Sequence, residues 1–555
     1  MIFFRLLFIL SAVTMTVLAT LRGPVIAGVL GVALSFLLFV WLAFRRGLAE
    51  NLFKPFSWLT GAIALPFAYS GGKIFMSYFY FRFEKLSRLL LDTLSRYRSI
   101  DEALWQGLLP MAKLLLTALA AAALWVVFYW LVKIFRHYGL PFIRRMTGLE
   151  KGFWLLAAAL SVLLIFSAYS RTNLFYQPAA AGQANKYDTV FTSDTGIHLQ
   201  TNAYININGP ENDLRQPLFG LFALPFGILA TWVAACFGGA LPVYALAIAS
   251  LQAIVLAFSL ILVSRLLKLR GLDQLIFLGL YFTSYPVLLF VLNLEQYVFA
   301  LFWLLLFIYS LCREELSGKA GTGEPWLWQP FCFSGAAGSM LTSGFFLFFI
   351  LKGGNFRRSF AVMFRTGLIF LAFLTVFGQM PLLWEAGTSL PRLLRFAGSS
   401  LPLQEKLRQY WGFLANCLAA PETYVTRNVF DQISWQLAPD QGLTWLGPVL
   451  FVLAAAAFLL YRKELYFRIC LAWLLFSFCL LVGVGWGAKE NGMILYTLYF
   501  SWALLSLLYG GWMKLLAKKP RLRRILGAVL MVALAWVNLA GIRQLIQFGV
   551  IYYPR

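Results

Sequence analysis

Long apolar stretches with almost no charge recur along the chain, and they constrain its fold more than any other feature. An α-helix needs roughly 20 predominantly apolar residues to cross a bilayer. The 555-residue sequence holds about fourteen such stretches, at 2–20, 24–44, 57–80, 109–135, 152–170, 242–264, 272–292, 295–312, 328–354, 359–383, 442–461, 465–486, 491–513 and 522–541. Glycines at 335, 338 and 344 divide the stretch 328–354 into an expected helical hairpin. We therefore predict an all-α polytopic membrane protein with about fifteen spans.

Composition excludes several other classes of protein. Hydrophobic residues make up 61% of the chain and charged residues 12%, whereas soluble domains contain about 25% charged residues. A water-soluble enzyme and a disordered chain are therefore disfavoured. The six cysteines form no CxxC pair and only two histidines occur, so neither a disulfide framework nor a multi-histidine metal site is indicated.

The net charge of +24 has two readings, nucleic-acid binding or the basic cytoplasmic loops of a membrane protein. With the N-terminus inside, alternating spans place most of the basic connections on one side, at 45–54, 133–151, 265–270, 357–358, 462–463 and 514–524. This arrangement predicts a cytoplasmic N-terminus and no nucleic-acid partner. It requires that 217–238, which carries Pro217 and Pro225, dips into the membrane without crossing. It also places the basic segment 81–108 outside, as an amphipathic surface helix.

The same assignment divides the chain into four parts. Residues 1–150 are an N-terminal transmembrane module of about four spans. Residues 151–385 are a core that includes a first external loop at 171–241. Residues 386–441 form a second external loop, and 442–555 are the C-terminal spans. Both external loops are expected to carry surface helices.

The first external loop contains the best candidate for catalysis, Asp194. This residue precedes the helix-compatible run TGIHLQTNAY, where an N-cap carboxylate stays ionised and oriented. Such a carboxylate can act as a general base toward an alcohol or amine. The alternative, which is open for each acidic residue of this loop, is a solvated side chain without a catalytic role.

Two further groups lie at the expected external boundary of the membrane. Glu295 falls between two apolar runs, and a carboxylate at that depth is costly and more often functional; the alternative is a structural glutamate bonded to backbone or to an arginine. Lys489 and Glu490 lie beside Trp486 in GVGWGAKENGM. The lysine can hold a lipid phosphate or form a surface pair with Glu490, and the tryptophan can stack on a sugar or belong to the interfacial aromatic belt.

Taken together, the segments resemble the GT-C superfamily of integral-membrane glycosyltransferases, which includes protein mannosyltransferases and the aminoarabinose lipid A transferase. The matching pieces are the span 152–170, SDTGIHLQTNAY with Asp194, the Pro-led RQPLFGLFALPF with Pro217, the span ending SRLLKLRG, the following pair of spans, and FSGAAGSMLTSGFFLFFILKGGNFRR. The resemblance covers about residues 150–541. The family's second adjacent carboxylate is absent, because Thr195 follows Asp194, and Gln216 replaces the usual histidine before proline.

The resemblance implies a polyprenyl-phosphate sugar as donor and an envelope glycan, lipid or protein as acceptor. Asp194 would be the general base of an inverting transfer at the external face of the cell (inner) membrane, with Glu295 as a second catalytic carboxylate that orients a substrate. Residues expected to bind the donor phosphate are Lys489, Arg215, Arg392 and Arg395, and those expected to bind acceptor or sugar are Asp188, His198, Tyr204, Glu490 and Trp486. No cofactor is expected; a divalent cation is used by some family members, and the single acid makes it less expected here.

Two other functions fit the same spans. One is a lipid-linked sugar transporter or flippase, which is disfavoured because no internal repeat is evident. The other is an inactive scaffold with a GT-C-like fold in a cell-envelope assembly, in which residues 1–150 bind a membrane-protein partner.

Overall fold

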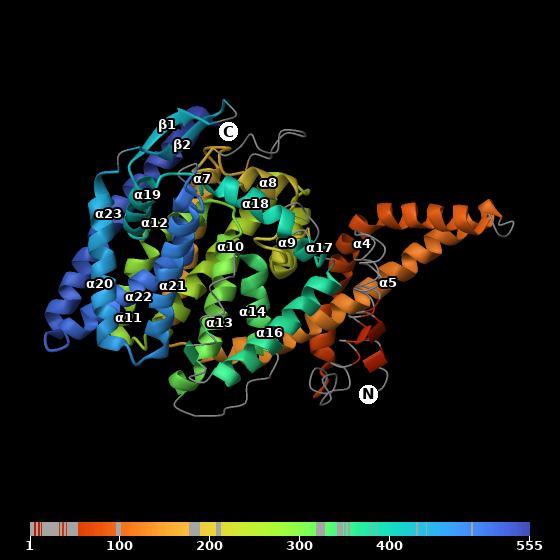
Figure 1. Ribbon diagram of the computed structural model, residues 1–555, viewed down its shortest axis with the longest axis horizontal. Helices are drawn as coiled ribbons and strands as arrows, with labels where there is room; N and C mark the ends of the chain where they lie inside the picture. Colours follow the sequence, from red (N-terminus) through yellow and green to blue (C-terminus); the bar gives the residue numbers. More distant parts are fainter. Residues whose placement is uncertain are drawn as a thin grey trace. The chain divides into compact units, whose positions relative to one another are not determined.

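The computed structural model consists almost entirely of helices (Figure 1). It describes residues 54–95, 101–176, 189–206, 213–317, 328–340, 348, 351–352, 356–377, 379–384, 386–428, 431–439, 441–489 and 492–555, with isolated positions between 5 and 40. In this described part, eight helices are long and apolar enough to cross a membrane, or nine if one bent pair counts as a span. A helical, multi-pass membrane protein is thus confirmed at this level. The predicted spans at 2–20 and 24–44 and most of the second half of the hairpin at 328–354 lie outside the described residues.

The chain forms two compact units. The first contains residues 1–146, 203–229 and 368–385, and the second contains 147–202, 230–367 and 386–555.

Helices α4 (Trp58–Ser95) and α5 (Glu102–Ile134) form a long antiparallel hairpin in the first unit. Near its tip, Trp105 Nε1 donates to Ser87 Oγ at 2.9 Å. Further along, a Cβ on Gly72 would lie 3.0 Å from the Cα of Ala121, so a small residue permits the close approach. The segment 81–108, expected as an amphipathic surface helix, is helical as the end of α4 up to Ser95 and as the start of α5 from Glu102; its place on the membrane surface stays a prediction. The rest of this unit includes η2 (Phe135–Gly139), α6 (Leu140–Arg144) and α17 (Pro381–Trp384).

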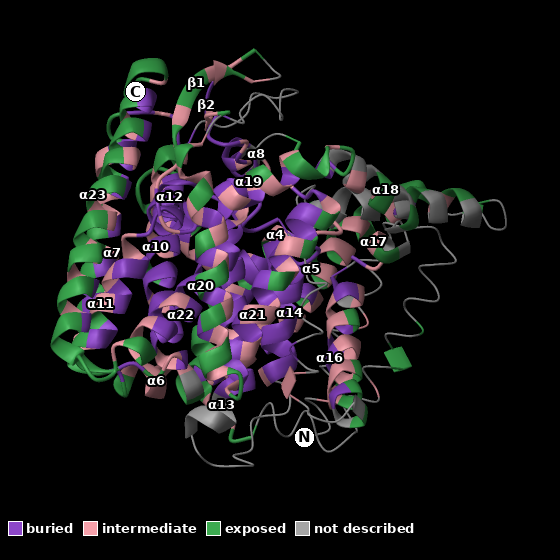
Figure 2. Cartoon of the chain, turned by 60° about the vertical axis from the view of Figure 1, so that its left-hand side comes forward, coloured by how far each residue is buried: buried purple, intermediate pink, exposed green. Residues whose placement is uncertain are grey.

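The second unit holds most of the apolar core. Helices α9 (Phe219–Cys236) and α16 (Phe356–Val376) have residues in both units. The other helices of the second unit are α7 (Gly148–Tyr169), α8 (Thr195–Gln200), α10 (Leu241–Leu266), α11 (Gly271–Phe282), α12 (Tyr285–Leu292), α13 (Tyr297–Ser317), α14 (Trp328–Ser339), α18 (Ala386–Ala397), α19 (Leu403–Asn416), η3 (Gly442–Trp445), α20 (Leu446–Tyr461), α21 (Leu465–Phe478), η4 (Cys479–Val484), η5 (Gly492–Tyr496), α22 (Thr497–Leu515) and α23 (Pro520–Tyr552). Figure 2 shows α10, α12 and α22 largely buried, whereas α23 is exposed along one side.

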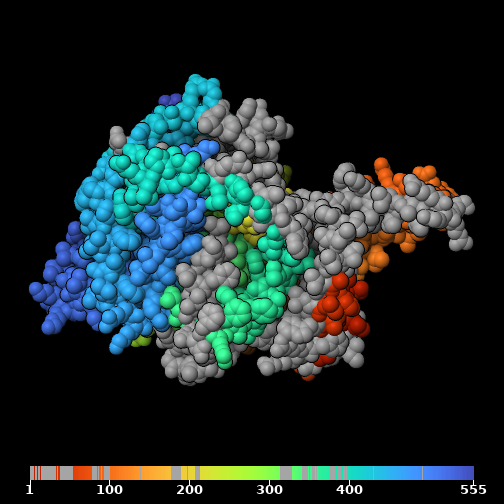
Figure 3. All heavy atoms as spheres, viewed as in Figure 1, coloured from red at the N-terminus to blue at the C-terminus, as the bar shows by residue number. Residues whose placement is uncertain are grey.

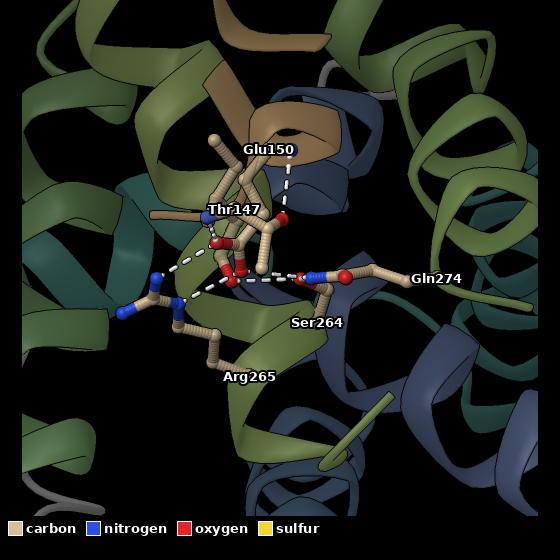
Figure 4. A network of polar contacts seen from close by, with 6 residues as sticks. Thr147, Glu150, Ser264, Arg265 and Gln274 are labelled. Atoms are coloured by element: carbon tan, nitrogen blue, oxygen red, sulfur yellow. Dashed lines mark hydrogen bonds and ion pairs between the residues drawn. The ribbon is translucent and has the colours of Figure 1, made fainter. Parts of the chain in front are cut away.

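Helices α7 and α10 run antiparallel, which fixes the path of the segment between them. Glu150, at the start of α7, forms an ion pair with Arg265 at the end of α10, and Gln274 also donates to Glu150 (Figure 4). Trp154 Nε1 donates to the carbonyl oxygen of Ile254 at 3.1 Å. The segment 170–240 therefore begins and ends at the same end of the second unit. Helix α9 has the length and apolarity of a span, but this path is the one expected if 217–238 does not cross.

A β-hairpin covers the end of the second unit to which segment 170–240 returns (Figure 1). Strands β1 (Thr423–Arg427) and β2 (Ile433–Leu437) pair in antiparallel register, and Val190 adds a parallel bridge to Trp435. Tyr553 of the C-terminus donates to the Ile433 carbonyl oxygen at 2.5 Å. In the space-filling view, the hairpin and the blue C-terminal helices form one surface (Figure 3). The segment 386–441, predicted as the second external loop, carries the helices α18 and α19, whereas the hairpin was not predicted.

Helix α19 lies at the same end as this hairpin and carries a surface ion pair. Arg408 donates to Glu405 at 2.9 Å. The hydrogen bond from Arg408 lowers the pKa of the Glu405 carboxyl below its ordinary value, with a further contribution from Gln409.

One buried amide fastens α23 to the rest of the second unit, and its removal is expected to destabilise the fold. Asn538 Nδ2 donates to the carbonyl oxygens of Thr283 and Leu418 at 2.7 and 2.8 Å, and its Oδ1 accepts from the N–H of Ala420 at 2.7 Å. We expect Asn538→Leu to cost about 1–3 kcal/mol, because backbone groups lose their partners in a buried place. The midpoint of unfolding in detergent measures this loss. Gln544→Leu, at an exposed position of the same helix, is the control, and equal midpoints for the two variants would contradict the prediction.

Candidate functional site

A strained turn precedes Asp194 and is fastened to the β-hairpin. The N–H of Ser193 donates to the Val190 carbonyl oxygen at 2.9 Å, and Phe191 and Thr192 have φ angles of 52° and 62°. Positive φ at both central residues is the geometry of a type I′ turn. A β-branched residue such as Thr192 rarely adopts it. Since the N–H of Phe191 donates to the Trp435 carbonyl oxygen at 2.9 Å, β2 holds this conformation in place.

Glu295 reaches the same turn from a helix break. It lies between α12 and α13, is 1% exposed, and its Oε1 accepts a hydrogen bond of 2.5 Å from the backbone N–H of Asp194. The break is itself supported, because Gln252 Nε2 donates to the carbonyl oxygens of Phe290 and Asn293 at 2.6 and 2.8 Å. Glu295 therefore fixes the backbone of Asp194.

His198 completes the cluster. Its ring is fully buried, and its Nδ1 lies 2.7 Å from the carbonyl oxygen of Asp194 and 3.9 Å from Glu295 Oε2. A carbonyl oxygen only accepts, so Nδ1 carries a proton in this contact. The N–H of Asp194 and its carbonyl oxygen are thus each bonded to a buried side chain.

The carboxylate of Asp194 differs from its backbone. The side chain is half-buried, and no hydrogen bond or ion pair joins its oxygens to any residue within the described ranges. We expected the carboxylate to be oriented by capping α8. Instead, Asp194 lies directly before α8 but is oriented through its own N–H and carbonyl oxygen. This arrangement leaves the carboxylate oxygens able to accept a proton or a hydrogen bond from another molecule.

The segment around Lys489 lies against the turn that precedes Asp194. A Cβ on Gly492 would lie 3.1 Å from Thr192 Oγ1. Gly485 and Gly487 have φ angles of 80° and 76°, which favour glycine, and Lys489 is exposed at the end of this turn. The structure therefore brings the lysine's segment to the candidate site, although the two are far apart in the sequence.

Aromatic rings pack beneath this segment. Trp486 is 8% exposed and its Nε1 donates to Tyr496 Oη at 2.9 Å. Tyr297, two residues beyond Glu295, lies with its ring 6.0 Å from that of Tyr496 and 5.0 Å from that of Tyr499. The ring of Trp486 is therefore part of the internal packing. It has no exposed face for the sugar that we had predicted to stack there.

The other predicted residues belong to the first unit, or they or their side chains lie outside the described residues. Arg215 forms an ion pair with Asp213 at 2.6 Å in the first unit. Tyr204, in the same unit, is fully buried with its ring 5.6 Å from that of Phe219. Asp188 and Glu490 lie outside the described residues, as do the side chains of Arg392 and Arg395, whose backbone belongs to α18.

Gln252 is the residue of this site that the sequence analysis did not identify. It lies in the middle of the apolar helix α10 and is fully buried. A glutamine in a membrane span is expensive unless it is bonded, so its presence was a usable signal. Within the described residues, no group of three or more His, Cys, Asp or Glu side chains is placed to hold a metal ion.

No family model matches the chain, and neither a curated protein nor a solved structure matches it. The geometry of Asp194, His198 and Glu295 is therefore the basis on which a function is inferred.

Proposed function

We propose that the chain is a membrane glycosyltransferase that moves a sugar from a polyprenyl-phosphate-linked donor to an envelope acceptor. The observation that carries this proposal is the Asp194 carboxylate, which has no partner among the described residues while its backbone is held on both sides by buried groups. A fixed carboxylate with free oxygens suits a general base. The family resemblance of residues 150–541 supplies the donor class.

In the proposed reaction, the acceptor hydroxyl or amine transfers its proton to Asp194 and attacks the anomeric carbon. The bond from that carbon to the phosphate oxygen breaks, and the polyprenyl phosphate leaves with the electron pair, so the configuration inverts. Negative charge grows on the phosphate, and a nearby cation stabilises it. Lys489 is our first candidate for this role because its segment packs against the Asp194 turn.

The proposed orientation places this site on the external face of the cell membrane. The opposite end of the second unit carries the connections rich in lysine and arginine, at 265–270, 462–463 and 514–524. The side with the most basic connections normally faces the cytoplasm. About fifteen spans and a cytoplasmic N-terminus are part of this proposal.

The proposal can be tested with the purified chain in proteoliposomes that contain polyprenyl-phosphate-linked pentoses and hexoses. We expect release of polyprenyl phosphate, with transfer of the sugar to water or to an added alcohol. Passage of the intact donor across the bilayer without bond cleavage would instead identify a flippase. A chain that does neither, although folded, would be the scaffold, and both of these outcomes would overturn the proposal.

A further inference from the structure

A small cavity lies beside the Asp194 turn and has polar walls. Its lining includes Thr189, Ser193, Thr195 and Asn293. Two of these residues, Ser193 and Thr195, flank Asp194 in the chain. Asn293 comes from the helix break that also carries Glu295. The cavity therefore lies between the two segments that the Glu295 hydrogen bond joins.

Two buried polar groups on this wall have no partner among the described residues. Thr195 is 7% exposed and Asn293 is 1% exposed. Neither the Thr195 hydroxyl nor the Asn293 Nδ2 group forms a hydrogen bond within the described part of the chain. Leaving such groups unpaired is unfavourable. Two of them on the wall of one cavity, which is lined by the residues on either side of Asp194 in the chain, indicate a place for a polar group of a ligand.

The residues that line the cavity determine which kind of ligand group fits into it. Neither a carboxylate nor a cationic side chain is among the described lining residues, so the wall offers no charge to compensate an ion. An apolar group would leave both polar atoms unpaired. A hydroxyl fits, because its oxygen accepts from the Asn293 amide and its proton can be donated to Thr195 Oγ1.

We infer that this cavity binds a second hydroxyl of the acceptor, adjacent to the one that is glycosylated, so that the acceptor is a polyhydroxylated carbohydrate. This inference rests on the proposed function, since it names the acceptor class of the same reaction. Thr195 and Asn293 are then specificity residues for the acceptor. A lone serine or threonine of a protein, or an amine, offers no neighbouring hydroxyl for this cavity.

Competition between two small alcohols tests the inference. Proteoliposomes with the polyprenyl-phosphate-linked sugars receive equal concentrations of ethylene glycol and ethanol, and the two glycoside products are measured. The ratio of products does not depend on donor binding or on the total amount of active protein. We expect wild type to favour ethylene glycol by roughly fivefold beyond its twofold statistical advantage, the effect of about one hydrogen bond.

Thr195→Val and Asn293→Leu are expected to reduce that ratio to about the statistical value. Thr195→Ser, which keeps the hydroxyl, is expected to keep the wild-type ratio. We also expect both apolar variants to unfold at or above the wild-type midpoint, because they remove an unpaired polar group. Lower midpoints together with an unchanged product ratio would mean that the cavity holds only a structural water, and would overturn the inference. If wild type cleaves no donor at all, the proposed function itself fails, whereas donor cleavage without preference for ethylene glycol contradicts the inference alone.

Discussion

Asp194→Asn is expected to lower the rate of sugar transfer by about 10²–10⁴-fold, the usual contribution of a general base. The amide keeps the size and shape of the side chain but cannot take the acceptor's proton. Asp194 is positioned through its backbone, whose N–H bonds to the Glu295 carboxylate and whose carbonyl oxygen bonds to the His198 ring. The turn is therefore expected to persist in the variant. Transfer measured at saturating donor, together with the unfolding midpoint, separates loss of chemistry from loss of fold.

Two variants serve as controls for this loss. Asp431→Asn makes the same chemical change at an exposed carboxylate that pairs with Arg427, and we expect unchanged transfer. Glu295→Gln keeps an oxygen that can accept the Asp194 N–H, so a positioning role for Glu295 predicts that most activity remains. If Asp194→Asn transfers sugar as fast as Asp431→Asn, Asp194 is not the base.

The length of the apolar stretches alone predicted many of the helices. A helix that crosses a bilayer needs about 20 apolar residues, and few other structures need so long an apolar stretch. The observed α7, α10 and α20 begin and end within a few residues of the predicted stretches, as do η5 and α22 taken together. The predicted span 272–292 consists of two helices, α11 and α12, with a bend of 57° between them. The signal was present in Pro286, because a proline has no N–H for the carbonyl oxygen of Phe282, four residues earlier, and is tolerated only in the first turn of a helix.

Contacts between distant segments were beyond what the sequence could predict. Asp194 and Glu295 were both identified singly, by position and chemistry, but nothing local indicates that the Glu295 carboxylate accepts from the Asp194 N–H across 101 residues. The strands β1 and β2 carried a readable signal, since TYVTR and ISWQL are rich in β-branched and aromatic residues around a turn. Nothing in the sequence indicates that Val190 pairs with Trp435.

The network around Glu150 is expected to give the largest effect on stability. Glu150 is 3% exposed and accepts from Arg265 Nε and Nη2 at 2.8 and 2.7 Å, and from Gln274 Nε2 at 2.9 Å (Figure 4). It also closes a capping box with Thr147 at the start of α7. Glu150→Ala leaves the arginine without its carboxylate in a largely buried place, so we expect a loss of about 3–5 kcal/mol in the free energy of unfolding.

A double-mutant cycle combines Glu150→Ala with Arg265→Met. It separates the stabilisation that the ion pair provides from the cost of leaving the Arg265 guanidinium without its carboxylate. We expect the double variant to be more stable than Glu150→Ala alone, because no unpaired guanidinium remains. Glu464→Gln is the matched control, since its pair with Lys268 at 3.5 Å is exposed to solvent, and such pairs contribute about 0–1 kcal/mol. Reversible unfolding in detergent measures wild type, the two single variants, the double variant and the control. Equal losses for Glu150→Ala and Glu464→Gln would mean that burial of the network adds nothing to the contact between α7 and α10.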